Sequence, residues 1–162
     1  TFTGIIITSF ESALNACVIL TSFIPMLSGT GGNSGSQSSV AVIRALSLDE
    51  VEFSDVLAVL WKEIRVAVLC GVCLGGANFI KMMVVDRWLM HNPEVTPLVA
   101  LVVCLTLMLT VVCAKIVGCT LPMAAEKVGI DPAVMAAPFI TTIVDALSLL
   151  IYFAIATHVL GI

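Results

Sequence analysis

The sequence predicts an all-α, polytopic membrane protein, and this prediction depends on its composition and on the length of its apolar stretches. Of the 162 residues, 60% are hydrophobic and 11% are charged, whereas an ordinary globular domain has about 25% charged residues. The mean hydropathy is +1.16, so the chain lacks the polar side chains that a water-exposed surface requires. Several stretches approach or exceed the ~20 residues that a helix needs to cross a bilayer. We therefore expect about four complete transmembrane helices, preceded by the tail of another.

The chain opens with the apolar stretch "TFTGIIITSF", which is too short to span a membrane. It has neither a charged leader nor a small-residue cleavage site, so it does not read as a signal peptide. We interpret residues 1–10 as the tail of a truncated first helix or as an interfacial lead-in, and the chain as a fragment of a longer protein. The first complete span is expected at about 11–43.

A polar segment lies within this first span. Residues 28–39 read "SGTGGNSGSQSS", with four glycines, five serines and no charge. In a soluble protein this composition is typical of a flexible linker, but here both flanks are apolar and too few residues follow for another span. Irregular backbone at membrane depth is tolerated where it is buried in protein or lines a water-filled cavity. With Pro25 expected to disrupt the helix, we predict an interrupted helix that lines a pore; an extramembrane loop is the alternative.

The remaining elements follow in order. Residues 44–65 read as an acidic loop that leads into an amphipathic, interfacial helix. The second span is expected at about 66–85, and a short polar turn leads to the third at about 97–118, which overlaps a run of twenty uncharged residues from 95 to 114. The fourth span is expected at about 132–159, where Asp145 is the one charged residue between 132 and 157.

Asp145 is the second polar anomaly, because it stands near the middle of the last span in "FITTIVDALSLLIYF". An aspartate at the centre of a membrane helix costs about 2.5–3.5 kcal/mol to insert, and such residues mark ion pathways or paired groups. Its neighbours one turn away are the hydroxyl residues Thr141, Thr142 and Ser148, not basic residues. We expect a cation partner; a structural hydrogen bond to the Gly/Ser backbone is the alternative.

Other residues carry weaker signals. Glu11 and Glu63 stand near span ends, where each could be interfacial or could line a pore mouth. The six cysteines lie mostly in or beside apolar runs, where cysteine behaves as a small hydrophobe. The sequence contains no nucleophile–base set, no G-x-x-x-x-G-K phosphate loop and no nucleic-acid patch. We therefore do not expect an enzyme or a nucleic-acid partner.

Basic residues predict the orientation of the spans, because cytoplasmic loops carry an excess of lysine and arginine. The loops after the first and third spans share one side of the membrane and together carry five basic residues, whereas the loop after the second span carries two. The five are Arg44, Lys62, Arg65, Lys115 and Lys127, and the two are Lys81 and Arg87. We expect the C-terminus to lie outside a cell membrane, and specifically a bacterial inner membrane.

Three motifs occur together in this chain: "FESAL" at 10–14, "FIPMLSGTGGNSGSQSS" at 23–39 and "GIDPAV" at 129–134. The most specific pattern is P-x-x-x-G-x-x-G-N-x-G-x-Q, which begins at Pro25 and ends at Gln37. Together they resemble the membrane domain of the MgtE family of magnesium channels, and the similarity covers nearly the whole chain.

The resemblance implies a homodimer with five helices per protomer, the first mostly missing here, and a pore on the two-fold axis lined by the first and last complete spans. It implies a pore aspartate at Asp145, pore-facing carbonyls at Gly29, Gly32 and Thr141, and an acidic residue of the cytoplasmic mouth at Asp131. The other residues expected to line the pore are Pro25, Asn33, Ser36, Gln37, Ala137, Pro138, Thr142 and Ser148. Family members commonly carry asparagine at the positions of Ser36 and Ala137. The family's cytoplasmic magnesium-sensing domains are absent from this chain.

We therefore expect a channel or transporter for Mg²⁺, with other divalent cations such as Mn²⁺ as further cargo. Mg²⁺ prefers octahedral oxygen ligands and loses its water reluctantly, so two facing carboxylates and a ring of carbonyls suit a hydrated ion. The alternatives are a non-transporting membrane scaffold subunit and an exchanger coupled to Na⁺ or H⁺.

Overall fold

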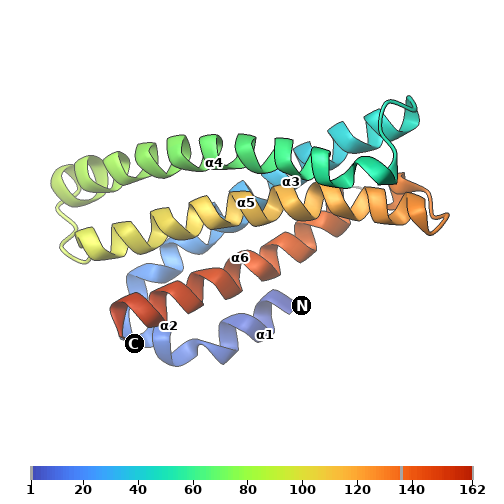
Figure 1. The fold of residues 1–162 in the computed structure, drawn as a ribbon. Helices are drawn as coiled ribbons and strands as arrows, with labels where there is room; N and C mark the ends of the chain where they lie inside the picture. The colour runs from blue at the N-terminus through green and yellow to red at the C-terminus, as the bar shows by residue number, and fades with distance from the viewer. Residues whose placement is uncertain (1, 136, 162) are drawn as a thin grey trace.

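All regular structure in the described residues is helical in the computed structural model, which describes residues 2–135 and 137–161 (Figure 1). The elements are α1 (Phe2–Ser9), α2 (Glu11–Ala16), η1 (Val18–Phe23), α3 (Ile24–Ser47), η2 (Phe53–Asp55), α4 (Val56–Lys81), η3 (Met82–Leu89), α5 (Pro97–Lys127), η4 (Pro132–Met135) and α6 (Ala137–Leu160). The elements η1, η2 and η4 are short 3-10 helices, and η3 is a π-helix that continues α4. The predicted helical class is confirmed.

Three stretches in the described residues are long and apolar enough to cross a membrane. They are Phe53–Leu89, Pro97–Lys127 and Pro138–Leu160. With 24 residues, α3 is about 36 Å long at 1.5 Å per residue, but its glycines and serines make it too polar to be recognised by hydropathy. The chain is thus a polytopic helical membrane protein, while the full number of four spans stays a prediction.

The Gly/Ser stretch is part of an unbroken α-helix, so the predicted interruption of the first span within it is wrong. Pro25 lies in the first turn of α3, where the absence of an amide hydrogen costs no helical hydrogen bond. The irregular backbone lies before it, where Cys17 separates α2 from the 3-10 helix η1. Glycine lowers helix propensity, but the contacts of α3 with its neighbours compensate for this.

The boundary predicted between an interfacial helix and the second span is also wrong. A single helix, α4, begins at Val56, includes the charged "WKEIR" segment and ends at Lys81, and the π-helix η3 extends it to Leu89. Neither glycine nor proline stands between Val56 and Cys70, so nothing in the backbone stops the helix at the charges. Similarly, α5 continues beyond the predicted end of the third span at 118 to Lys127.

The helix α5 is the centre of the bundle and contacts α3, α4 and α6 (Figure 1). Its contact with α3 is close because glycines of α3 face it at four-residue spacing. A Cβ atom on Gly31 would lie 2.6 Å from Thr110 Cγ2, and one on Gly118 would lie 2.2 Å from the carbonyl oxygen of Gly35. The two backbones therefore touch, and a larger residue at these positions would push the helices apart.

A second packing region joins α6 to the N-terminal part of the chain. The Tyr152 hydroxyl is fully buried and donates a hydrogen bond of 2.9 Å to the carbonyl oxygen of Leu20 in η1. The rings of Phe10 and Phe153 stack with centroids 4.8 Å apart. These contacts fix one end of α6 against η1 and α1, and they leave its other half available to face α3.

Candidate functional site: the contact between α3 and α6

Three of the residues predicted for the site meet where α3 crosses α6. A Cβ atom on Gly32 would lie 3.1 Å from Thr141 Cγ2 and 3.8 Å from Asp145 Oδ1. Thr141 and Asp145 stand four residues apart on α6, which places them on the same face of that helix. The polar helix and the intramembrane aspartate, 113 positions apart in sequence, are therefore in direct proximity.

Asp145 is half-buried and has a hydrogen bond to the side chain of Ser28. The ion pairs found within the described residues involve other carboxylates. Ser28 was not among the predicted site residues, although it stands one helical turn before Gly32 and so shares its face. The sequence had offered a structural hydrogen bond from Asp145 to the Gly/Ser backbone as an alternative, and the partner in the structure is a side-chain hydroxyl.

One face of α3 is polar and uncovered by the rest of the chain. Its residues recur every three or four positions, are exposed or half-exposed, and lie next to the edge that contacts α6. They are Pro25, Gly29, Asn33, Ser36 and Gln37, which we call the polar stripe. No heavy atom would lie within 4 Å of a Cβ atom on Gly29. A polar face of this kind is unfavourable against lipid, so in a membrane it requires water or another protein surface.

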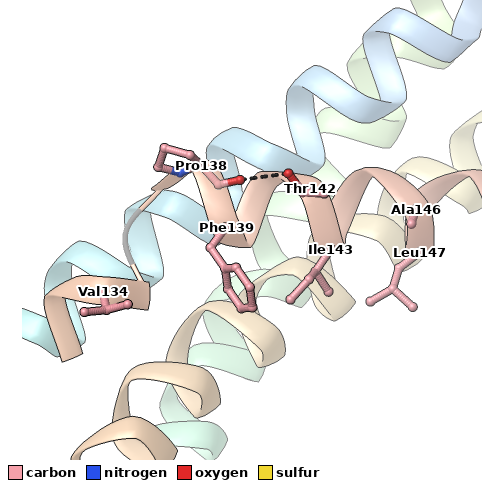
Figure 2. A pocket seen from close by; sticks show the side chains of 7 residues that line it. All are labelled: Val134, Pro138, Phe139, Thr142, Ile143, Ala146 and Leu147. Atoms are coloured by element: carbon pink, nitrogen blue, oxygen red, sulfur yellow. Dashed lines mark hydrogen bonds between the residues drawn. The ribbon is translucent and has the colours of Figure 1, made fainter. Parts of the chain in front are cut away.

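Beside the polar stripe, α6 has an open apolar face. A hollow of about 760 Å³ lies along this helix, and Figure 2 shows the side chains that line it. Its lining residues are Val134, Pro138, Phe139, Thr142, Ile143, Ala146 and Leu147. The Thr142 hydroxyl donates a hydrogen bond of 2.9 Å to the carbonyl oxygen of Pro138, and the Thr141 hydroxyl donates one of 3.0 Å to the same oxygen. Both threonines therefore keep their hydroxyl hydrogens inside α6, and each can offer oxygen lone pairs outward.

Several predicted site residues lie away from this contact. Ser148 is buried, and its hydroxyl donates to the carbonyl oxygen of Asp145 at 2.8 Å, so it lies behind the open face and not on it. Asp131 is exposed and accepts a hydrogen bond of 2.8 Å from the amide of Ala133. Glu11 is exposed in the first turn of α2. The side chain of Ala137 lies outside the described residues.

The other predicted mouth residue, Glu63, has protein partners. Its carboxylate forms an ion pair with Lys115, with Nζ and Oε2 3.0 Å apart, and accepts a hydrogen bond from Ser38. The sequence prediction had not paired Glu63 with either residue, because 25 and 52 positions separate them from it.

Among the described residues, no three His, Cys, Asp or Glu side chains gather as the ligands of a metal ion. The six cysteines are free thiols, and Cys104 and Cys119 are buried. Within the described part of one chain, the polar groups at the α3–α6 contact are thus one carboxylate, hydroxyls and backbone carbonyls.

A bundle of apolar membrane helices with a carboxylate held against a polar helix defines a class of protein: a polytopic membrane protein whose polar groups converge inside the bilayer. Sequence comparison identifies the family. The chain belongs to the MgtE family, whose profile, described as "Divalent cation transporter", matches residues 24–155.

Relatives with a curated description carry the name "Magnesium transporter MgtE". The protein of Bacillus subtilis is 38% identical over 155 residues, and that of Thermus thermophilus is 37% identical over 154 residues. Each alignment covers 95% of this chain and 32% of the relative. The protein of Enterococcus faecalis is 34% identical over 155 residues. The chain therefore spans about a third of the length of the curated relatives it matches.

Proposed function

We propose that this chain forms the ion-conducting part of a magnesium transporter, in which Mg²⁺ crosses the membrane between two copies of the chain. The pore follows their two-fold axis, and Asp145 of each copy forms a central site. The observation that carries this proposal is the proximity of Asp145 to Gly32 of α3, beside the uncovered polar stripe. The names of the relatives, which are magnesium transporters, support the identity of the ion.

A second copy of the chain is the partner that best fits the uncovered surfaces. The polar stripe needs water, whereas the apolar hollow beside it, lined by residues such as Phe139 and Leu147, needs protein or lipid. A two-fold axis along this edge satisfies both requirements, because the apolar parts pack on each other while the stripes enclose water between them. The two halves of the pore wall then come from α3 and α6 of each copy.

The available ligands suit a hydrated ion. Because α3 is a continuous helix, the carbonyls of Gly29 and Gly32 already accept helical hydrogen bonds and retain one lone pair each. Such oxygens, with the hydroxyls of Thr141 and Thr142, can bind the water shell that Mg²⁺ gives up reluctantly. Two Asp145 carboxylates neutralise the divalent charge, and binding through water leaves the ion free to move on.

The deciding experiment is Mg²⁺ uptake by proteoliposomes that contain the wild type or the Asp145→Asn variant. A pair of unit charges ~4 Å apart is worth about 4 kcal/mol at an effective dielectric constant of ~20, and 1.4 kcal/mol already corresponds to a factor of ten. We therefore expect Asp145→Asn to lower uptake more than about tenfold and Asp145→Glu, which keeps the charge, to lower it less. Asp86→Asn is the matched control, because this carboxylate pairs with Lys81 at the far end of α4. If Asp145→Asn took up Mg²⁺ at the rate of the wild type, the proposal would be refuted.

The hydrogen bond from Ser28 favours a second candidate, in which Asp145 is structural and the chain is a non-transporting scaffold subunit. Removing that bond distinguishes the two. In a scaffold, Ser28→Ala and Asp145→Asn should both lower the melting temperature, with no Mg²⁺ uptake by the wild type. Uptake that requires a Na⁺ or H⁺ gradient would instead indicate a coupled exchanger. We also propose that the C-terminus lies outside the bacterial inner membrane, because Arg44 and Lys127 at the ends of α3 and α5, and Lys62 and Arg65 in the first part of α4, then lie on the cytoplasmic side.

A further inference from the structure

Apart from the α3–α6 contact, the described residues include a group of three buried polar side chains that bond to each other. Ser38 of α3, Glu63 of α4 and Lys115 of α5 meet between their three helices. The Lys115 ammonium donates to Glu63 Oε2 at 3.0 Å and to Ser38 Oγ at 3.3 Å, and the Ser38 hydroxyl donates to the same Glu63 oxygen. Ser38 is 1% exposed, and the side chains of Lys115 and Glu63 are 11% and 14% exposed. We call these three residues the polar triad.

The polar triad is poorly suited to bind a passing cation. The Glu63 oxygen that faces the other helices already accepts two hydrogen bonds, and the ammonium of Lys115 lies 3.0 Å away from it. A Mg²⁺ ion near this carboxylate would be repelled by the ammonium, and the pair as a whole is neutral. In this respect Glu63 differs from Asp145, which has a hydrogen bond to the uncharged hydroxyl of Ser28.

The triad does provide a directional contact next to the glycine-rich middle of α3. In the middle of α3, the surface that packs against α5 and α6 includes Gly31, Gly32 and Gly35. These glycines allow close approach but contribute no side chain of their own to interdigitate, and the larger buried side chains of α3, Leu27, Val42 and Leu46, lie nearer its two ends. Ser38 follows Gly32 by six residues, about 9 Å along the axis, and it is held from two other helices at once.

We infer that Ser38, Glu63 and Lys115 are positioning residues that fix the rotation and depth of α3, so that Gly32 and the polar stripe stay aligned with Asp145. This inference rests on the proposed transport function. Buried ion pairs contribute little to net stability compared with apolar residues of similar volume, and their best-attested role is to select one arrangement among alternatives. The polar triad therefore determines the position of α3 in the pore wall and contributes little to the stability of the bundle.

The test separates positioning from folding. In the double variant Glu63→Gln/Lys115→Met, no charge remains buried and unpaired, so we expect a melting temperature equal to or above that of the wild type. Maximal Mg²⁺ uptake should nevertheless fall at least fivefold, with little change in the Mg²⁺ concentration for half-maximal rate. The exchanged variant Glu63→Lys/Lys115→Glu restores a pair that Ser38 can bridge, and it should recover most of the uptake.

Ser38→Ala is the second variant, because it removes one anchor without leaving a charge unpaired. It should lower the maximal rate of Mg²⁺ uptake without changing the Mg²⁺ concentration for half-maximal rate. It should also speed amide hydrogen exchange in α3. The matched control is Lys81→Met/Asp86→Asn, which removes the exposed ion pair of α4 and η3 and should change neither quantity. The inference would be overturned if the neutral double variant took up Mg²⁺ at the wild-type rate. It would also be overturned if Ser38→Ala raised the Mg²⁺ concentration for half-maximal rate. If the wild type takes up no Mg²⁺, the proposed function is wrong. The positioning role is tested separately by hydrogen exchange, and an unchanged exchange rate in α3 of Ser38→Ala would overturn it.

Discussion

Replacing Gly118 by alanine tests whether the contact between the backbones of α3 and α5 holds the pore wall in place. The new Cβ atom would lie 2.2 Å from the carbonyl oxygen of Gly35 and 3.0 Å from its carbonyl carbon. To reach 3.0 Å, below which such carbons essentially never approach, the oxygen must move by about 0.8 Å. No rotamer can relieve this contact, because both partners are fixed to the backbone. Overpacking of this kind costs about 1–3 kcal/mol, which for a chain of this size corresponds to a decrease in melting temperature of roughly 2–12 °C.

The matched control is Gly76→Ala in α4, since no heavy atom lies within 4 Å of the position of its Cβ. There, alanine should stabilise the helix by about 0.5–1 kcal/mol. The assay is thermal unfolding of the purified protein in detergent, together with Mg²⁺ uptake by proteoliposomes. We expect Gly118→Ala to lower both, because α3 is displaced from α5 and Gly32 moves relative to Asp145. A Gly118→Ala protein with the melting temperature and uptake of the wild type would show that the two helices are not in backbone contact.

Two further substitutions separate stability from transport. Thr110→Val should raise the melting temperature, because the buried Thr110 hydroxyl has no hydrogen-bond partner among the described residues. Desolvating such a group costs about 1–3 kcal/mol. A lower melting temperature would show that the hydroxyl is bonded in the membrane. Gly29→Val should leave the melting temperature unchanged, since nothing lies within 4 Å of the position of its Cβ, but should reduce Mg²⁺ uptake by placing a branched side chain on the polar stripe. Normal uptake by that variant would exclude Gly29 from the pathway.

The features predicted from the sequence were those that depend on the chemistry of single residues. A twelve-residue polar stretch and a lone aspartate are each costly in hydrocarbon, so both were expected to face a common polar space. The structure places Gly32 beside Asp145, while the polar space itself stays a prediction. The family could be identified because the pattern from Pro25 to Gln37 combines rare residues at fixed spacing.

The features that could not be predicted depend on tertiary contacts. Local propensity suggested that a stretch rich in glycine and serine would break the helix, but packing against neighbouring helices overrides propensity. The charges before span 66–85 suggested an interfacial helix that ends at the membrane surface. One of those charges, Glu63, instead points into the bundle toward Lys115, which is 52 positions away in sequence. In helices that are apolar on nearly every side, no periodic pattern of the sequence predicts such a pair.

The composition of α3 can now be explained by two separate requirements on its opposite faces. On the inner face, Gly31 and Gly35 are small because atoms of α5 and α6 lie close against them, and Ser38 supplies a directional contact. On the outer face, Gly29 has open space beside it and Ser36 is half-exposed, so packing within the protomer does not require them to be small. A helix that needed small residues for packing alone could carry leucine or valine on that outer face and face lipid. The absence of such residues from 28 to 39 on both faces therefore argues that the outer face borders a narrow polar space, as a pore between two copies provides.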